Sequence, residues 1–367
     1  MTKILHTADL HLRQVGDLRW QALENLLQTA REHQVAALTI AGDLFDRDLD
    51  ANLIRENLRS LLSDLPFKVI IIPGNHDLKS YQQGFYFGSQ VELIEQRGQS
   101  IQLPGKTAAK VWGLPFEPLI NSAQGLEQIS QLNQQLDPTE KNILLFHGEL
   151  TDIFFNAQDF GDEGDKRYMP IKLNYFEQTS FDYVLAGHFH TQFHQKKIAN
   201  QRLDQGGYFV YPGSPVSITT KETGVRKAAL IELGQPPQDI NLNTSHFVPV
   251  ELKLSPQSTI KQLELLEQEL VQLPDQATAL LKVSGYFDQE ALTLTESQLF
   301  QKIEKLATGF QCRFEQNEFT AKDINLILDS GLYQLFCQNL EQTSQIPTDQ
   351  KAQLKELLIQ AMIKLNS

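Results

Sequence analysis

The sequence predicts an α/β fold built in layers, and three observations support this prediction. Short apolar runs alternate with amphipathic stretches up to about residue 234. Such alternation is typical of a largely buried sheet covered by helices. Polar motifs directly follow several of the apolar runs, and a Gly-Gln-Pro-Pro segment at 234–237 interrupts the pattern. The chain therefore divides into a large layered domain and a smaller C-terminal part.

Each element of the large domain is predicted from its own pattern. Residues 17–33 repeat apolar side chains at helical spacing, which predicts an amphipathic helix, and 53–62 predict a second one. The apolar face of the first helix comprises Trp20, Leu23, Leu27 and Ala30. Runs rich in Ile, Leu and Val predict buried strands. These strands are expected at 3–6, 35–41, 68–72, 142–146 and 183–186.

Beyond residue 234 the alternation is shorter and predicts a small α/β capping domain over 235–328. Its expected strands are 248–254 and 279–286, and its expected helices are 259–273 and 295–307. Two further helices, at 330–342 and 348–365, are expected in a C-terminal segment that spans 329–367.

Composition limits the class of protein. The 367 residues suffice for two or three domains, and the hydrophobic fraction of 41% is ordinary for a globular protein. No stretch approaches the roughly 18 consecutive apolar residues of a membrane span. Neither a signal peptide nor metal-type cysteine spacing is recognisable, so a cytoplasmic protein with free thiols is expected. The net charge of −13 argues against a wide basic groove that binds nucleic acid unaided.

Four short motifs occur in order along the chain, each after a buried apolar run. Because sites in open α/β sheets form beyond the carboxyl ends of the strands, these side chains are expected to converge. Glycines in the motifs let the backbone turn sharply there. The motifs are Asp9-Leu10-His11, Gly42-Asp43, Gly74-Asn75-His76-Asp77 and Gly187-His188-Phe189-His190, with His147-Gly148 between the last two.

The residue types of these motifs predict a centre for two divalent metal ions. Two ions about 3.5–4 Å apart need a bridging ligand, and we assign Asp43 to this role because a carboxylate suits it. Oxygen and nitrogen ligands without thiolates suit Mn²⁺, Fe or Zn²⁺. Only two ligands are anionic, so the loaded site keeps positive charge and favours a phosphate ester. The first ion is assigned to Asp9, His11 and His190, and the second to Asn75, His147 and His188.

Other polar residues near the motifs have predicted roles besides metal binding. His76 and Asp77 are the predicted catalytic residues: His76 stabilises charge or protonates the leaving oxygen, and Asp77 orients the groups around it. His6, inside the first strand, is expected to pack in the core. Asp46 fits two roles, an acid behind the ligands or a cap of the next helix.

The ordered motifs resemble those of the calcineurin-like metallophosphoesterase superfamily. Residues 4–12 (ILHTADLHL) and 41–46 (AGDLFD) resemble the SbcD-type DNA-repair exonucleases in particular. Tyr211-Pro212-Gly213-Ser214-Pro215 matches the stretch that follows the last metal motif in that family. The resemblance is strong over residues 1–234. It implies that this part is the nuclease domain, a β-sandwich flanked by helices.

The same resemblance implies an activity and partners. It implies a two-metal nuclease, usually dependent on Mn²⁺, that hydrolyses phosphodiester bonds at DNA ends in repair and recombination. It also implies an SMC-like ATPase partner of the SbcC type and a homodimer. The ligand roles assigned above match the family's positions, and His76 matches its catalytic histidine. An apolar stripe on the last helix fits either the ATPase partner or packing within its own domain. The stripe comprises Leu354, Leu357, Leu358, Ala361, Met362 and Leu365.

The acidic composition sits less well with a DNA substrate, because DNA-binding proteins neutralise phosphates with Lys and Arg. Two other classes therefore stay open, a phosphoesterase for a small molecule and a scaffold that lacks activity. The filled ligand positions count against the scaffold. Candidate phosphate-binding cations are Arg13, Lys79, Arg97, Lys166, Arg167, Lys196 and Lys197.

Overall fold

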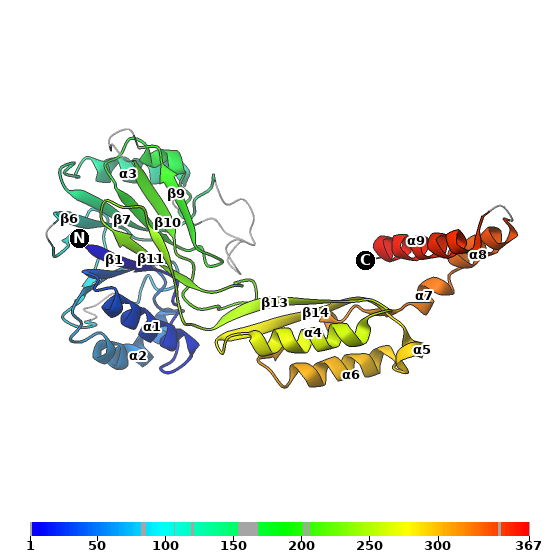
Figure 1. Cartoon of the computed structure of the whole chain (residues 1–367). Coiled ribbons are helices and arrows are strands. Elements are labelled where there is room, and N and C mark those ends of the chain that lie inside the picture. The colour runs from blue at the N-terminus through cyan, green and yellow to red at the C-terminus, as the bar shows by residue number, and fades with distance from the viewer. Residues whose placement is uncertain are drawn as a thin grey trace. The chain divides into compact units, whose positions relative to one another are not determined.

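The computed structural model describes residues 2–81, 86–105, 107–118, 121–152, 168–200, 203, 206–343 and 346–366. The chain forms two compact units, Met1–Phe247 and Val248–Ser367, which Figure 1 traces from blue to red. No helix in the described residues has the length and apolar character needed to cross a bilayer.

The first sheet of the first unit has six strands in the order β12-β11-β1-β2-β3-β4. Strands β1 to β4 pair in parallel, whereas β11 and β12 extend the sheet in antiparallel pairs. The register sets Thr7 opposite Ile40 and Ile40 opposite Ile71, so the carboxyl ends of β1, β2 and β3 are level. The bounds are β1 Lys3–Thr7, β2 Ala37–Ala41, β3 Lys68–Ile72, β4 Val91–Leu93, β11 Lys227–Glu232 and β12 Gln238–Asn241.

The second sheet also has six strands, in the order β5-β6-β7-β8-β10-β9. Its four central strands pair in parallel, and β5 and β9 pair antiparallel at the edges. His147, the last residue of β7, lies opposite Gly187, the last residue of β8. The bounds are β5 Ser100–Gln102, β6 Ala109–Leu114, β7 Lys141–His147, β8 Tyr183–Gly187, β9 His194–Ile198 and β10 Gly207–Tyr211.

Strand periodicity sorts the apolar side chains into layers. In β1, Leu5 belongs to the core beneath helices α1 (Leu18–Glu32) and α2 (Asp48–Leu61), whereas its neighbour Ile4 belongs to the core between the sheets. The outer face of the second sheet packs on α3 (Ser122–Asn133) and the short helix η2 (Leu173–Phe176). Each fully buried Leu or Ile stabilises the fold by about 1.5–3 kcal/mol. The result is the expected β-sandwich flanked by helices (Figure 1).

Helix α1 forms where the apolar repeat predicts it, with Asp17 accepting a hydrogen bond from the Trp20 amide as N-cap. Helix α2 instead begins at Asp48, five residues before the predicted start. Its first turn carries Asp48 and Asp50, whose charges suit a helix N-terminus, but its Leu49 and Leu53 are exposed. The apolar repeat therefore marks only the later, buried part of this helix. Arg47 occupies the N-cap position, so Asp46 is not the cap.

The Gly-Gln-Pro-Pro segment has a different role from the one expected. It connects β11 to β12, and these strands pair antiparallel, so 234–237 form a turn inside the first unit. Gly234 has a φ of 91°, which a glycine adopts without strain. Glycine and proline mark tight turns and domain boundaries alike. The compact units divide later, at 247/248 within β13 (His246–Leu254), rather than at 234/235.

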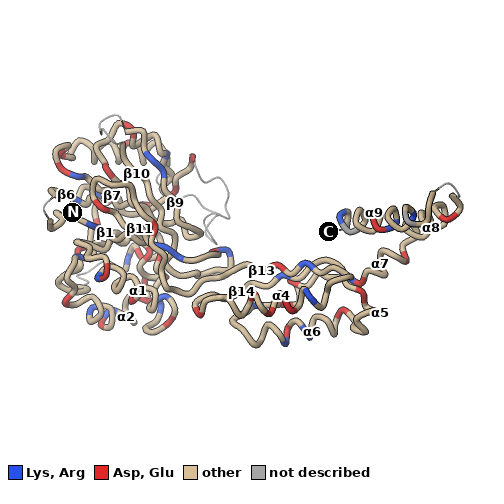
Figure 2. Tube along the Cα trace, viewed as in Figure 1, with Lys and Arg blue, Asp and Glu red and all other residues tan. Residues whose placement is uncertain are grey.

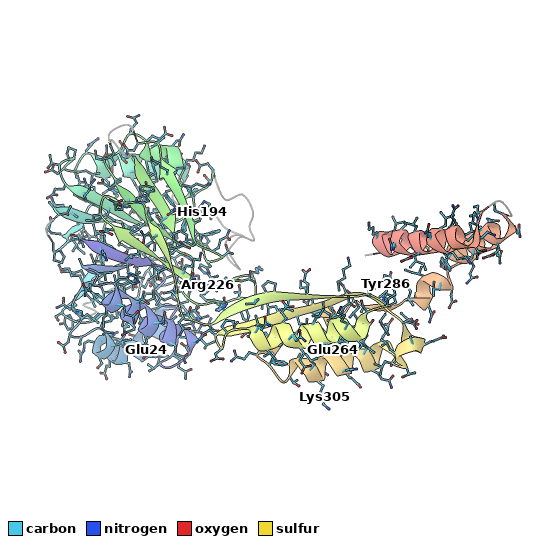
Figure 3. All side chains as sticks on the ribbon, in the orientation of Figure 1. Glu24, His194, Arg226, Glu264, Tyr286 and Lys305 are labelled. Carbon is cyan, nitrogen blue, oxygen red and sulfur yellow. The ribbon has the colours of Figure 1, made fainter. Side chains whose placement is uncertain are left out.

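The second unit contains a small sheet in the order β13-β14-β15, with β16 paired to β14. Helices α4 (Thr259–Gln272) and α6 (Glu296–Ala307) share its core, and Glu264 on α4 and Lys305 on α6 are labelled in Figure 3. The remaining bounds are β14 Ala277–Phe287, β15 Cys312–Arg313, β16 Lys322–Asp323, α5 Gln289–Leu292, η3 Gln316–Glu318, α7 Asn325–Leu328, α8 Gly331–Gln342 and α9 Thr348–Asn366.

The apolar stripe expected on the last helix is divided between two environments. Met362 is buried, and Leu358 packs against the same small cluster as Tyr286 and Ile327. Leu357 and Leu365 are 60% and 84% exposed. Packing within the second unit thus uses only part of the stripe.

Candidate metal centre

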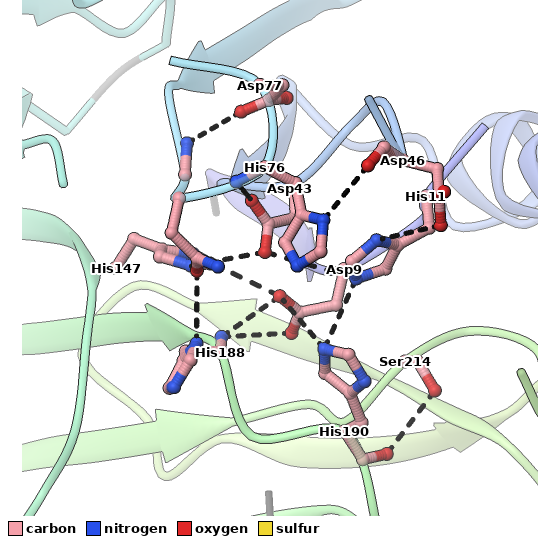
Figure 4. A network of polar contacts seen from close by, with 12 residues as sticks. Asp9, His11, Asp43, Asp46, His76, Asp77, His147, His188, His190 and Ser214 are labelled. Atoms are coloured by element: carbon pink, nitrogen blue, oxygen red, sulfur yellow. Dashed lines mark hydrogen bonds and ion pairs between the residues drawn. The ribbon is translucent and has the colours of Figure 1, made fainter. Parts of the chain in front are cut away.

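The seven predicted ligands lie at the carboxyl ends of strands from both sheets. Asp9 and His11 follow β1, Asp43 follows β2 and Asn75 follows β3, all in the first sheet. The second sheet supplies His147 at the end of β7, and His188 and His190 after β8. Figure 4 shows the six labelled ligands pointing toward one another: Asp9, His11, Asp43, His147, His188 and His190.

The ligand atoms form two groups that share one residue. Asp9, His11, Asp43 and His190 offer atoms within 4.8 Å of one another, and so do Asp43, His147 and His188. In the first group, Nε2 of His11 lies 3.2 Å from Nε2 of His190. The His190 atom is also 3.9 Å from Oδ1 of Asp9. Two imidazole nitrogens and a carboxylate oxygen therefore face the same point.

The second group has a similar arrangement. Oδ1 of Asn75 lies 2.8 Å from Nε2 of His147 and 3.2 Å from Nδ1 of His188. Nδ1 of His147 lies 2.8 Å from the carbonyl oxygen of Ala41, and because a carbonyl only accepts, Nδ1 carries the hydrogen. When His147 is neutral, as a metal ligand has to be, this leaves the lone pair on Nε2, which faces Asn75 and Asp43.

Asp43 is the residue that links the two groups. Its Oδ2 lies 3.3 Å from Nε2 of His147 and 3.9 Å from Nε2 of His11. Among the described residues, this buried oxygen has ion-pair contacts with the two imidazoles but no well-formed hydrogen bond. An unsatisfied buried carboxylate oxygen is unfavourable unless a cation neutralises it. The donor set, with oxygen and nitrogen atoms and no sulfur, therefore fits a pair of divalent ions.

The charges of the centre favour cations. Burial alone lowers the pKa of His147, but the carboxylates of Asp43 and Asp9 reverse this effect and raise its pKa to about 9. Burial raises the pKa of Asp43, yet the imidazoles of His147 and His11 outweigh burial and hold that pKa below its usual range. For Asp9, burial is the stronger effect, and its pKa is raised.

The backbone is strained at the ligands themselves. Asp9, His11, Asp43 and His188 have φ values of 55°, 49°, 51° and 99°, in the region that favours glycine. Strain of this kind costs on the order of 1–3 kcal/mol per residue and persists where the surrounding structure enforces it. The enforcing contacts are hydrogen bonds: both oxygens of Asp9 accept from the His188 amide at 3.0 Å. Oδ1 of Asp43 accepts from the His76 amide at 2.9 Å.

Glycines at the strand ends leave room for these contacts. A Cβ on Gly42 would lie 2.0 Å from Nδ1 of His147, and one on Gly74 would lie 2.1 Å from Oδ1 of Asp43. A Cβ on Gly187 would lie 1.9 Å from the carbonyl oxygen of Ala41, in the opposite sheet. A side chain at any of the three would displace a ligand or separate the sheets.

The two predicted catalytic residues occupy different places. His76 is half-buried, its ring lies edge-on to His11 with 4.8 Å between centroids, and its Nδ1 lies 2.9 Å from the carbonyl oxygen of Asp46. Since that carbonyl only accepts, Nδ1 carries the hydrogen and Nε2 is the atom that can exchange a proton.

Asp77 lies behind the loops rather than among the ligands. Its carboxylate accepts hydrogen bonds from the amides of Gly74, Leu44 and Phe45 and from the hydroxyl of Tyr81, at 2.7–3.2 Å. Burial raises its pKa to about 6. Asp77 therefore ties the loop after β2 to the loop after β3, which agrees with an orienting role.

The structure places two residues behind His190 that belong to none of the sequence motifs, Glu222 and Arg226. Oε1 of Glu222 lies 3.5 Å from Nδ1 of His190, and Glu222 is fully buried. Arg226, labelled in Figure 3, is 2% exposed and donates to the carbonyl oxygens of His190, Thr191 and Ser214. Burial lowers the pKa of this guanidinium to about 10. The Tyr-Pro-Gly-Ser-Pro stretch pointed toward this region, but nothing in the spacing marked Glu222 or Arg226.

Comparison with known proteins found a matching family model and two similar proteins. The family model described as Calcineurin-like phosphoesterase matches residues 2–192, just over half of the chain. The chain is 24% identical over 317 residues to the SbcD subunit of the SbcCD nuclease of Staphylococcus epidermidis, covering 78% of this chain and 77% of that protein. It is 26% identical over 327 residues to the DNA double-strand break repair protein Mre11 of Methanosarcina acetivorans, covering 82% of this chain.

The match covers only 50% of the Mre11 protein, so the chain spans about half the length of that relative. Among solved structures, purple acid phosphatase PPD1 from yellow lupin (Lupinus luteus) seeds is similar at 10% identity with a TM-score of 0.39. That match covers 67% of this chain and 48% of the other.

Proposed function

The chain belongs to the calcineurin-like phosphoesterase family, and from this membership we propose that it is a two-metal nuclease that cleaves DNA at its ends. The family and its nuclease relatives make it a metal-dependent phosphodiesterase. The observation that carries the finer proposal is the pair of buried ligand groups that share Asp43, in a chain similar to two DNA-processing proteins.

Each residue of the centre has a role in this proposal. Asp9, His11 and His190 would hold one ion, Asn75, His147 and His188 would hold the other, and Asp43 would serve both. We propose Mn²⁺ as the resident metal. When bound, two divalent ions supply an activated water and neutralise negative charge on the phosphoryl group.

His76 acts beside the ions rather than as a ligand. Its Nδ1 is fixed to the carbonyl oxygen of Asp46, which orients Nε2 for donation of a hydrogen bond or a proton to the leaving oxygen. His76→Ala is expected to leave the ligand groups intact and to lower the rate at least about 100-fold.

A DNA substrate has to be bound by a chain of net charge −13. Figure 2 shows Lys and Arg interspersed with Asp and Glu in both units rather than gathered in one stripe. Five of the candidate cations are described, and all are exposed: Arg13, Lys79, Arg97, Lys196 and Lys197. Lys166 and Arg167 lie outside the described residues. A partner that supplies part of the DNA contact would explain how so few cations suffice.

We propose an SMC-like ATPase of the SbcC type as this partner, acting with the nuclease in the cytoplasm in DNA repair and recombination. The exposed Leu357 and Leu365 of α9 are the surface we assign to it. Replacing both by Asp should abolish co-purification with the ATPase. Leu265→Asp, at a 52% exposed leucine of α4, is the matched control and should leave the complex intact.

A homodimer belongs to the same proposal. Leu49 and Leu53 of α2 are 72% and 75% exposed, and a second copy of the chain would cover them. Leu53→Glu should convert the dimer to a monomer in light scattering. An unchanged mass would remove α2 from the interface.

The proposed function is tested by degradation of end-labelled linear duplex DNA with purified protein and Mn²⁺. Hydrolysis of bis(p-nitrophenyl) phosphate is measured beside it, and His76→Ala serves as the inactive control. Loss of label from DNA by the wild type but not by the variant is expected. Cleavage of the small ester alone, even with the ATPase present, would contradict a DNA substrate and favour a small-molecule phosphoester.

A further inference from the structure

The segment after His11 is fixed to the loop after β2. The amides of His11 and Leu12 donate to the carbonyl oxygens of Asp43 and Leu44 at 2.9 and 2.8 Å, and the Asp46 amide donates to the Leu12 carbonyl at 3.2 Å. Three backbone hydrogen bonds within so few residues make this a short, rigid ladder. The side chain that follows it, Arg13, therefore starts from a defined position beside the centre.

The guanidinium of Arg13 is also held in place. Its Nε and Nη2 lie 2.8 and 2.7 Å from Oδ2 of Asp46, the one side chain among the described residues that pairs with it. The Arg13 side chain is nevertheless 52% exposed. A guanidinium has five N–H donors, so three remain for another acceptor. Arg13 is thus an oriented cation that still has donors available.

The local charge leaves Arg13 available for an anion. Asp46 also pairs with Nη1 of Arg19 at 2.9 Å, and Arg19 donates to the His11 carbonyl oxygen at 2.6 Å. Two guanidinium groups thus share one carboxylate, which leaves the trio with a net positive charge. The Arg19 side chain is only 15% exposed, so the excess charge reaches solvent through Arg13.

Asp46 connects this cation to the reacting groups. Its carbonyl oxygen lies 2.9 Å from Nδ1 of His76, and its Oδ1 lies 3.5 Å from Nδ1 of His11. Asp46 is thus not a helix cap but an acid behind the ligand His11, and it contacts His76 and Arg13 as well.

We propose that Arg13 binds a second phosphate of the substrate, next to the phosphodiester that is cleaved. The planar fork of arginine pairs with two phosphate oxygens, and such pairs are stronger than neutral hydrogen bonds. Arg13 would then favour polynucleotides over simple diesters, without preference for base sequence. This inference rests on the proposed nuclease function and names the residue that selects a chain of phosphates.

The test compares two substrates in Arg13→Gln and in the wild type. End-labelled DNA offers neighbouring phosphates, whereas bis(p-nitrophenyl) phosphate offers none. Arg13→Gln is expected to raise the KM for DNA roughly tenfold with little change in kcat, and to leave the small ester within about twofold. The slope of log KM against log salt for DNA should fall by about one, because one phosphate contact is lost.

Two other arginines provide controls. Arg31→Gln removes the same charge at the opposite end of α1 and should leave KM and kcat unchanged for both substrates. Arg19→Gln removes the other partner of Asp46 from a nearly buried position. Arg13→Gln could instead resemble Arg19→Gln and lower kcat/KM by the same factor for DNA and for the small ester. Arg13 would then act by positioning Asp46, and the inference would be overturned. No change for either substrate would overturn it as well.

Failure of the nuclease proposal gives a different result. In that case the wild type hydrolyses the small ester but not DNA, and a short oligonucleotide is used as a competitive inhibitor of ester hydrolysis. A higher inhibition constant for Arg13→Gln than for the wild type would support the phosphate contact on its own. Equal inhibition constants would overturn it.

Discussion

The two sheets of the first unit contribute different chemistry to the same site. The first sheet supplies the oxygen ligands, Asp9, Asp43 and Asn75, whereas the second supplies only imidazoles. Their supports differ as well. The carboxylates of the first sheet accept hydrogen bonds from backbone amides, as Asp9 does from His188 and Asp43 does from His76.

Two imidazoles of the second sheet, those of His147 and His190, are held instead through a partner of their Nδ1 atom. That partner is the Ala41 carbonyl oxygen for His147 and the Glu222 carboxylate for His190. The comparison shows two kinds of support: backbone amides hold the carboxylates of Asp9 and Asp43, and acceptor oxygens hold the imidazoles of His147 and His190.

The largest expected effect comes from removing the oxygen that both ligand groups share. Asp43→Asn keeps a carbonyl oxygen that can accept from the His76 amide, but it removes the negative charge between the groups. Both ions should be lost together, and the rate should fall at least about 1000-fold, since several kcal/mol of charge stabilisation disappear. Metal analysis after gel filtration in Mn²⁺ measures the loss.

The matched control is Asp64→Asn, at an exposed aspartate whose φ of 56° is close to the 51° of Asp43. This variant should keep both ions and the wild-type rate. Loss of a single ion from Asp43→Asn would mean that another residue forms the bridge and that the two groups are more independent than their shared carboxylate indicates.

This division explains what the sequence could and could not predict. Every predicted ligand ends a strand or lies shortly after one. Residue types and strand patterns together were therefore enough to predict that all seven lie close together. Whether they bind metal stays a prediction. The helix over Leu18–Glu32 was also predictable, because its buried face repeats at helical spacing.

The supports behind the ligands were not predictable in the same way. Glu222 and Arg226 lie in a connection between β10 and β11, outside any motif, and reach His190 only through the fold. Asp46 was placed beside the site, but its contacts with Arg13 and His76 depend on the ladder between two loops. The expected division at 234/235 differs from the observed one because Gly234 and its prolines form a hairpin turn.

A smaller effect is expected from the support of the second sheet. Glu222→Gln removes the charge behind His190 while keeping the size of the side chain. Affinity for one Mn²⁺ should fall about 10- to 100-fold, because partners behind a metal-binding histidine fix its orientation and basicity. The second ion, which His147 and His188 would hold, should bind nearly as in the wild type. Calorimetric titration with Mn²⁺ distinguishes one weakened site from two.

Glu251→Gln, at an exposed glutamate of β13, controls for the loss of one acidic charge and should leave both affinities unchanged. An equal weakening of both ions by Glu222→Gln would contradict the separate support of the two groups. It would instead indicate that Glu222 stabilises the whole edge of the sandwich.

The smallest expected effect is on stability and concerns the His6 hydrogen bond that joins the two sheets away from the ligands. His6 of β1 is fully buried, with Nδ1 3.1 Å from the hydroxyl of Thr39 and Nε2 3.2 Å from the carbonyl oxygen of Ala186 in β8. Burial lowers its pKa from 6.5 to about 4. The expected packing role of His6 is thus confirmed, and its side chain also forms a hydrogen bond between the two sheets.

This pKa makes stability depend on pH in a defined direction. Between pH 6.5 and pH 4 the unfolded chain binds a proton at His6 that the folded chain does not, so the free energy of unfolding falls as pH falls, by about 2 kcal/mol from pH 7 to pH 5. The free energy of unfolding is measured by urea unfolding at pH 5, 6 and 7. In His6→Gln it should no longer fall by this amount as pH falls, whereas His33→Gln, at the end of α1, should keep the wild-type dependence on pH. Equal slopes for His6→Gln and the wild type would mean that the folded sandwich accommodates a charged His6, and that the bond to Ala186 does not require the neutral ring.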